Sequence, residues 1–278
     1  MTKTTKPIFV IPFNEAVIRK TDGFPIAVRT KDLEDIDRIA AVVSGDRLHC
    51  IEVVSDSLAG VQLKKDWQGL PLVFRLKSAG RLLDCIPALE GLRNSAARFY
   101  FQATRDNITA VRVLSSLMVK TGLIIDGDSA DWDEMEDLLA YDSCGKVAHT
   151  SIEPFRHVYA GYKKMQTDYS ELYLEKEGTF FHCDESGNIA ISAGALRKGD
   201  FIGTLDKASS IGFEGFSLSA REKRRAPLLN LEGCSICPAW RVCGYRKKED
   251  DKACASKQFM LALLDAAEQV NTNADNNI

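Results

Sequence analysis

The sequence lacks most of the signatures by which common catalytic and nucleotide-binding sites are recognised. It has no P-loop, no GxGxxG run and no HExxH pair, which removes the commonest nucleotide-binding and metallohydrolase interpretations. Histidine is scarce, with 4 residues in 278. Cys144 and His149 lie five residues apart with no identifiable orienting residue, so a packed cysteine and an ordinary histidine are favoured over a nucleophile and its base.

The chain also lacks long hydrophobic runs and a strong net charge. No apolar segment approaches the roughly 18 residues of a membrane span, and the polar start, Met1–Pro7, has no apolar signal-peptide core. We therefore expect a cytoplasmic protein with no membrane partner. The formal net charge of -3 gives no general electrostatic reason to bind nucleic acid.

Helical and strand-like patterns alternate along the first half of the chain. Two short apolar runs, Ile8–Pro12 and Phe24–Arg29, come first and are expected to form a lid or an edge hairpin. The following expected helix and strand pairs are 32–43 with 49–54, 58–67 with 72–76, 79–89 with 97–102, 107–120 with 122–126, and 131–141 with 146–149. This alternation predicts an α/β fold with parallel strands, with fewer units than a closed eight-stranded barrel.

The pattern changes after Ser151, where we place a domain boundary. The expected elements are a helix at 156–165, a hairpin of strands 180–183 and 188–192, a glycine-bounded strand at 199–205 and a closing helix at 258–270. Residues 271–278 form a polar tail with little to bury.

Four of the eight cysteines lie within residues 234–254, with the spacing C-x2-C-x5-C-x10-C. They are Cys234, Cys237, Cys243 and Cys254. A C-x2-C pair lets two sulfurs reach one metal centre. The longer gaps favour an iron-sulfur cube over a tetrahedral zinc ion, while zinc and reduced structural thiols stay open as alternatives. Disulfides are not expected in the cytoplasm.

Several segments together resemble the SPASM domain, the C-terminal auxiliary iron-sulfur region of radical SAM enzymes that modify peptides. Those after Ser151 are Pro154-Phe155, Tyr173-Leu174, Asp184–Ile189, Gly199–Leu205 and the C-x2-C-x5-C run. Upstream, three segments resemble strand and helix units of the radical SAM partial barrel: Arg98–Gln102, Asn107-Ile108 and Thr121–Ile125. The resemblance implies a degenerate partial (β/α) barrel of radical SAM type over 1–150, a small α+β SPASM or twitch-like iron-sulfur domain over 151–270, and a disordered tail over 271–278.

The sequence departs from this family at the positions that matter for catalysis. The C-x3-C-x2-C motif of radical SAM enzymes is absent, and Cys50, Cys85 and Cys144 are isolated. Ser192 and Lys247 stand where full SPASM domains have cysteine, which leaves Cys183 without enough partner ligands. The resemblance therefore implies one 4Fe-4S cluster, fully ligated by Cys234, Cys237, Cys243 and Cys254, and no radical chemistry in this chain.

The expected function follows from that combination. The chain resembles the SPASM-domain partner proteins of geopeptide-type systems, which mature ribosomally made peptides. This resemblance implies a non-catalytic protein that binds a radical SAM maturase, the precursor peptide or both, with its cluster serving electron relay or structure and an electron-donor protein as a further partner. Two alternatives stay open: an enzyme that binds S-adenosylmethionine or another small molecule in the barrel mouth, and a zinc-stabilised interaction module.

Overall fold

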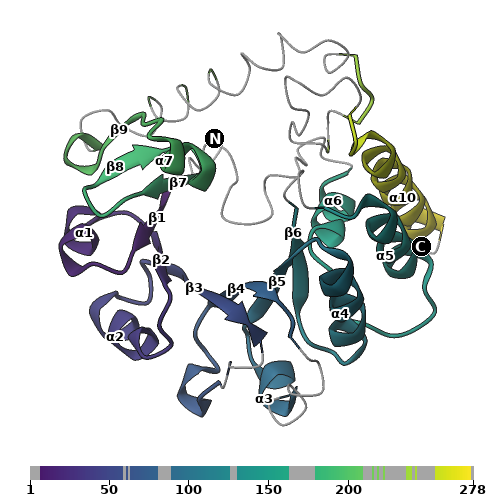
Figure 1. The fold of residues 1–278 in the computed structure, drawn as a ribbon, viewed down its shortest axis with the longest axis horizontal. Coiled ribbons are helices and arrows are strands. Elements are labelled where there is room, and N and C mark those ends of the chain that lie inside the picture. Colours follow the sequence, from purple (N-terminus) through teal and green to yellow (C-terminus); the bar gives the residue numbers. More distant parts are fainter. Residues whose placement is uncertain are drawn as a thin grey trace. The chain divides into compact units, whose positions relative to one another are not determined.

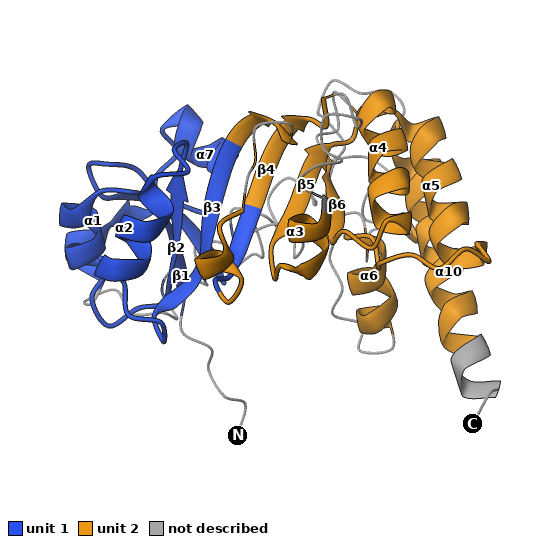
Figure 2. Ribbon diagram, turned by 90° about the horizontal axis from the view of Figure 1, so that it is seen from below, with its two compact units in different colours: residues 1–54, 70–73, 173–227 blue, residues 55–69, 74–172, 228–278 orange. Residues whose placement is uncertain are grey.

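The computed structural model describes residues 7–58, 61, 63–80, 89–125, 130–162, 179–208, 215, 218, 222, 236–239, 242 and 254–276. These residues divide between two compact units, each built from several segments of the chain (Figure 2). The first unit takes residues 1–54, 70–73 and 173–227, and the second takes residues 55–69, 74–172 and 228–278. Neither unit is delimited by residue 151, so the division of the chain at that position stays a prediction.

The fold is α/β, with a mostly parallel sheet. The elements, in chain order, are β1 (Ile8–Pro12), α1 (Glu15–Lys20), β2 (Ile26–Thr30), α2 (Asp35–Val42), β3 (Leu48–Ser57), η2 (Lys65–Trp67), β4 (Leu72–Ser78), α3 (Leu89–Asn94), β5 (Arg98–Gln102), α4 (Arg105–Ser116), β6 (Thr121–Ile124), α5 (Trp132–Cys144), α6 (Phe155–Gly161), β7 (Phe180–Cys183), β8 (Asn188–Ala190), α7 (Ala193–Lys198), β9 (Gly203–Thr204) and α10 (Lys257–Asn276) (Figure 1). The strand order in the nine-stranded sheet is β6-β5-β4-β3-β2-β1-β7-β8-β9.

In the first unit, β1 is a central strand that pairs in parallel with both β2 and β7. The hairpin expected for the first two strands is therefore wrong. Helix α1 lies between them, and Asn14 caps it by accepting a hydrogen bond from the backbone N–H of Ala16 at 2.9 Å. Because the helix carries the chain back along the sheet, β2 enters in the same direction as β1.

Both faces of β1 are buried, as expected for a strand inside a parallel sheet. On one face, the ring of Phe9 lies 5.2 Å from that of Phe24 and 6.2 Å from that of Phe181. On the other face, Val10 belongs to a buried cluster with Ala27, Cys50 and Phe180. This unit also contains the expected hairpin, because β7 and β8 pair antiparallel. Strand β9 pairs antiparallel with β8 but is shorter than expected, since Gly199 ends helix α7 with a φ of 72°.

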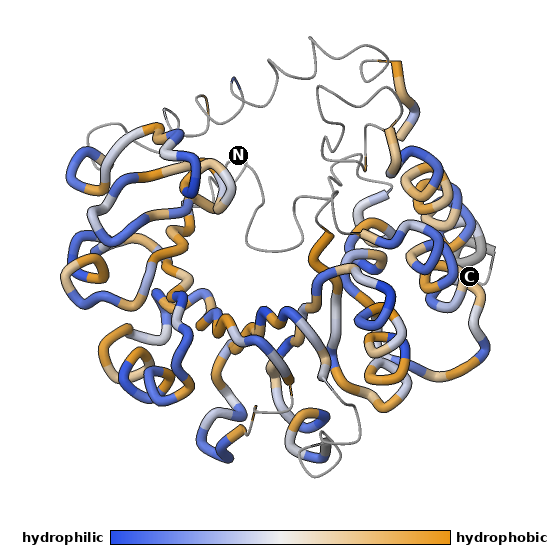
Figure 3. Tube along the Cα trace, viewed as in Figure 1, coloured by the Kyte–Doolittle hydropathy of each residue, from blue (hydrophilic) through white to orange (hydrophobic). Residues whose placement is uncertain are grey.

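In the second unit, β5 and β6 pair in parallel, and helices α4, α5, α6 and α10 pack in part against one another (Figure 1). Hydrophobic and hydrophilic positions both occur along α4 and α5 (Figure 3), as expected for helices with one buried face. Asp131 caps α5 by accepting from the N–H of Glu134 at 3.2 Å, which confirms that the helix begins there. Helix α10 reaches Asn276, into the segment that the sequence assigned to a polar tail.

Three expected elements of this unit have different outcomes. Residues 146–149 form no strand, although a strand is expected there. Among the described residues of 58–67, the structure has the short 3-10 helix η2 in place of an α-helix. Most of the helix expected at 79–89 lies outside the described residues.

Candidate metal centre

The structure describes two of the four predicted metal ligands, Cys237 and Cys254. The other two, Cys234 and Cys243, lie outside the described residues. All four belong to the segment of the chain that the second unit contains. Neither Cys237 nor Cys254 forms a disulfide. The structure therefore shows the local setting of half of the expected ligand set.

Cys254 is positioned by the start of helix α10. Its carbonyl oxygen accepts a hydrogen bond from the N–H of Lys257 at 3.1 Å, and its Sγ lies 3.4 Å from the hydroxyl of the buried Ser256. The helix itself is anchored by Phe259, whose ring lies 5.6 Å from that of Trp132 and 6.2 Å from that of Phe155. Aromatic packing on α5 and α6 thus fixes the backbone just beyond Cys254.

Cys237 lies between two exposed neighbours, Ile236 and Pro238, and two buried residues follow them. Ile236 is 84% exposed, whereas Ala239 and Val242 are buried and are joined by a hydrogen bond of 3.0 Å from the N–H of Val242 to the carbonyl of Ala239. Two buried side chains therefore follow Cys237 closely in the chain. The thiol itself is half-buried.

The described cysteines differ in burial, and this difference bears on which thiols suit a metal. Cys50 and Cys183 are buried. Burial, with the Glu52 carboxylate adding to it, raises the pKa of the Cys50 thiol, and burial together with Asp184 raises the pKa of Cys183. A metal needs the thiolate form, which burial disfavours at Cys50 and Cys183. Cys237 and Cys254 are half-buried.

Among the described residues, no three His, Cys, Asp or Glu side chains form a group that could hold a metal ion. Only two members of the four-cysteine set belong to those residues, so the complete set stays a prediction. Ser192, which stands where full SPASM domains have cysteine, has a structural role here: its hydroxyl accepts from the N–H of Ala195 at 3.0 Å and caps α7.

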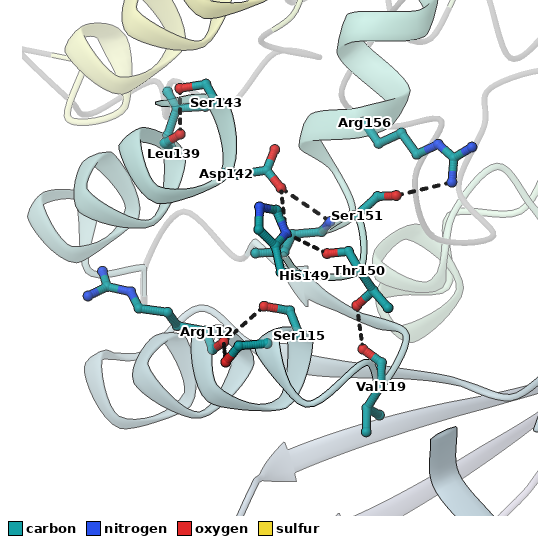
Figure 4. Close-up of polar contacts among 12 residues, drawn as sticks. Arg112, Ser115, Val119, Leu139, Asp142, Ser143, His149, Thr150, Ser151 and Arg156 are labelled. Atoms are coloured by element: carbon teal, nitrogen blue, oxygen red, sulfur yellow. Dashed lines mark hydrogen bonds and ion pairs between the residues drawn. The ribbon is translucent and has the colours of Figure 1, made fainter. Parts of the chain in front are cut away.

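Sequence reasoning missed the polar cluster around His149, because its partner lies on a different element. Nδ1 of His149 is 2.8 Å from the carbonyl oxygen of Thr150 and 3.8 Å from the carboxylate of Asp142, near the end of α5 (Figure 4). Asp142 also accepts from the N–H of Ile152 at 3.4 Å. These contacts tie the loop after α5 back to the helix. Cys144 is exposed, and the arrangement accounts for His149 as a structural residue.

A buried ion pair lies on the sheet of the first unit. Arg29 on β2 and Glu52 on β3 are partners in register, and Nε of Arg29 donates to the fully buried carboxylate of Glu52. Removing a carboxylate from water is costly unless a cation and hydrogen bonds compensate. Strand pairing places that cation directly beside it.

Comparisons with models of protein families, with curated proteins and with solved structures found no match for this chain. Among the described residues, no helix combines the length and the hydrophobicity needed to cross a membrane. The fold and the cysteine segment together define an α/β protein with a candidate thiolate site near its carboxyl end.

Proposed function

We propose that this chain is a non-catalytic iron-sulfur partner of a radical SAM peptide maturase. The observation that carries the proposal is the cysteine pattern: C-x2-C-x5-C-x10-C is present, while the C-x3-C-x2-C motif that would cleave S-adenosylmethionine is absent. The four thiolates of Cys234, Cys237, Cys243 and Cys254 would hold one 4Fe-4S cluster with every iron ligated by protein. Such a cluster supplies electron transfer or a structural link.

The arrangement of the described strands supports the proposal in two ways. Parallel strands with intervening helices are what a partial (β/α) barrel of radical SAM type requires. The antiparallel pair β7 and β8, joined by a turn at Asp184–Gly187, is the hairpin that the resemblance to a SPASM domain implies. The proposed partners are the maturase, its ribosomally made precursor peptide and an electron donor, and the proposed location is the cytoplasm.

The protein's own residues have a limited set of tasks in this function. Cys254 would bring its ligand from the turn just before α10, and the packing of Phe259 on Trp132 would keep the start of that helix in place. Cys237 would bring its ligand from the turn anchored by Ala239 and Val242. Hydrophobic side chains position the backbone near Cys237 and Cys254. Neither thiolate is therefore needed to hold the backbone, and both can bind the cluster.

Anaerobic purification followed by metal and sulfide analysis tests the proposal. We expect a brown protein with about four iron and four sulfide per chain, the stoichiometry of one cube. Replacing Cys234, Cys237, Cys243 or Cys254 with alanine should lower the iron content, whereas Cys144→Ala, at an exposed thiol outside the set, is the matched control and should not.

The same preparation separates the proposal from its alternatives. A colourless protein with one zinc per chain would identify a zinc-stabilised module, since four thiolates also suit tetrahedral zinc. Heat released on titration with S-adenosylmethionine would favour a small-molecule-binding enzyme. Either result would contradict the proposed function.

A further inference from the structure

Ser256 brings a buried hydroxyl to the predicted ligand Cys254. The serine is 3% exposed, and its Oγ lies 3.4 Å from Sγ of Cys254, two residues earlier in the chain. The two atoms are hydrogen-bonding partners. A side chain outside the set of four cysteines therefore contacts one of the expected ligand sulfurs directly.

The start of helix α10 fixes the backbone on both sides of this contact. The carbonyl of Ser256 accepts a hydrogen bond from the N–H of Met260 at 2.9 Å, which makes Ser256 the N-cap residue of the helix. The N–H of Lys257 donates to the carbonyl of Cys254 at 3.1 Å. Phe259, in the first turn, is fully buried. The backbone that carries the two side chains thus has hydrogen bonds of its own.

The direction of the Ser256 hydrogen bond follows from the chemistry of a ligand sulfur. A hydroxyl and a thiol can each donate to the other. A cysteine binds a metal as the thiolate, which has no proton to donate. When Cys254 is a ligand, the hydroxyl of Ser256 is therefore the donor and Sγ of Cys254 is the acceptor. Hydrogen bonds to an ionised acceptor are stronger than those between neutral groups.

A donor at a ligand sulfur favours the oxidation state with more negative charge. Reduction takes one electron from the proposed electron donor, and it makes or breaks no bond and moves no proton. Hydrogen bonds to the sulfurs are among the features that set the reduction potential of an iron-sulfur cluster. The effect is larger for a buried hydroxyl, because the low local dielectric strengthens the bond.

We propose that Ser256 raises the reduction potential of the cluster by donating a hydrogen bond to Cys254. The inference rests on the proposed function, in which Cys254 is a cluster ligand. Ser256 acts through Cys254, so it is a positioning residue and not a ligand. Its removal should change the potential of the cluster and leave the iron content unchanged.

Redox potentiometry of the anaerobically purified protein tests this role. Ser256→Ala should retain about four iron per chain. Its equilibrium with a one-electron mediator should shift about tenfold toward the oxidised form, because a hydrogen bond to a charged group is lost. A tenfold shift for one electron lowers the midpoint potential by about 59 mV. Ser256→Thr keeps the hydroxyl, and its equilibrium should stay within about twofold of the wild type.

Ser143→Ala is the matched control. The hydroxyl of Ser143 lies 3.5 Å from Sγ of Cys144, an exposed cysteine outside the ligand set, and donates to the carbonyl of Leu139 at 2.8 Å. Its removal should leave the potential unchanged. Ser256→Ala also changes an N-cap residue and should lower the thermal midpoint, so the potential, and not the stability, is the deciding measurement.

Electron–nuclear double resonance of the reduced wild type gives a second measurement that needs no variant. The hydroxyl proton of Ser256 exchanges with solvent, so we expect a proton coupling that disappears in D2O. The same coupling should be present in Ser256→Thr and missing in Ser256→Ala.

The outcomes separate this inference from the proposed function. Equal potentials of the wild type and Ser256→Ala, both with full iron content, would overturn the inference alone. Equal shifts in Ser256→Ala and Ser256→Thr would assign the effect to packing and would also overturn it. If Ser256→Ala loses its iron, the wild type decides, and the absence of an exchangeable proton coupling there refutes the inference. A wild type without iron would overturn both the inference and the proposed function.

Discussion

Gly122→Ala should destabilise the protein, because both sides of Gly122 are occupied. Gly122 on β6 lies in register with Tyr100 on β5 and forms a parallel bridge with Glu153 on its other side. A Cβ at this position would lie 2.6 Å from Cε1 of the Tyr100 ring and 2.8 Å from Cβ of Glu153. Real Cβ atoms do not approach other heavy atoms so closely, so one neighbour must move.

Neither neighbour can move freely. Glu153 is held by two backbone hydrogen bonds, from the N–H of Leu123 at 2.9 Å and to the carbonyl of Thr121 at 3.2 Å. Tyr100 is buried. Overpacking of this kind costs about 1–3 kcal/mol, and the lower entropy of the unfolded chain with alanine returns about 0.4–1 kcal/mol. We expect a net loss of about 1–2 kcal/mol in the free energy of unfolding.

Urea and thermal unfolding followed by circular dichroism would measure this loss. A change of about 1–2 kcal/mol corresponds to a thermal midpoint lower by about 2–6 °C in a protein of this size. Gly45→Ala is the matched control, because its added Cβ meets no atom within 4 Å. Equal midpoints for the two variants would refute the steric reasoning. The loss should also shrink in a Tyr100→Ala background.

Three further predictions concern buried polar groups. The side chain of Asn107 donates to the carbonyls of Lys77 and Gln102 and accepts from the N–H of Ala79. Asn107→Ala leaves these groups unsatisfied and should lower the free energy of unfolding in urea by about 2–3 kcal/mol. A loss smaller than that of the exposed control Thr109→Ala would contradict this role. Arg29→Met should cost about 3 kcal/mol by removing the cation beside the buried Glu52 carboxylate. Adding Glu52→Leu should restore part of the loss, and a double variant no more stable than the single one would count against the buried charge as the cause. Burial raises the pKa of the Asp142 carboxyl, and His149 opposes this shift. Because the folded state then disfavours the ionised carboxylate, the stability of the wild type relative to Asp142→Asn should rise as pH falls from 7 toward 4. A stability difference that does not change with pH in urea titrations would argue against a raised pKa.

Elements with strong local patterns could be predicted from the sequence. The strands at 49–54 and 97–102 and the helices around 107–120 and 131–141 follow hydrophobic periodicity, and the structure has β3, β5, α4 and α5 there. The β7 and β8 hairpin is predictable from its turn residues, because Asp184–Gly187 ends in a glycine. In the structure this glycine has a φ of 85°, as such a turn requires.

Features that depend on distant partners could not be predicted. Val147 and Ala148, within 146–149, suit a strand, but the loop that contains them is held by Thr150 against Ser115 and by His149 near Asp142. Met118 at positive φ escaped prediction as well, because the usual sequence signal for this position is glycine.

The amino-acid sequence by itself determined the spacing of the four clustered cysteines, the absence of a radical SAM cluster motif and the alternation of helices with strands. These are local properties, set by residue type and by periods of two or 3.6 residues. Only the tertiary structure decided that β1 and β2 run parallel, that Cys50 and Cys183 are buried while Cys237 and Cys254 are half-buried, and that Thr150 bonds to the end of α4. Strand direction and burial depend on pairing between residues far apart in the chain, which no local pattern specifies.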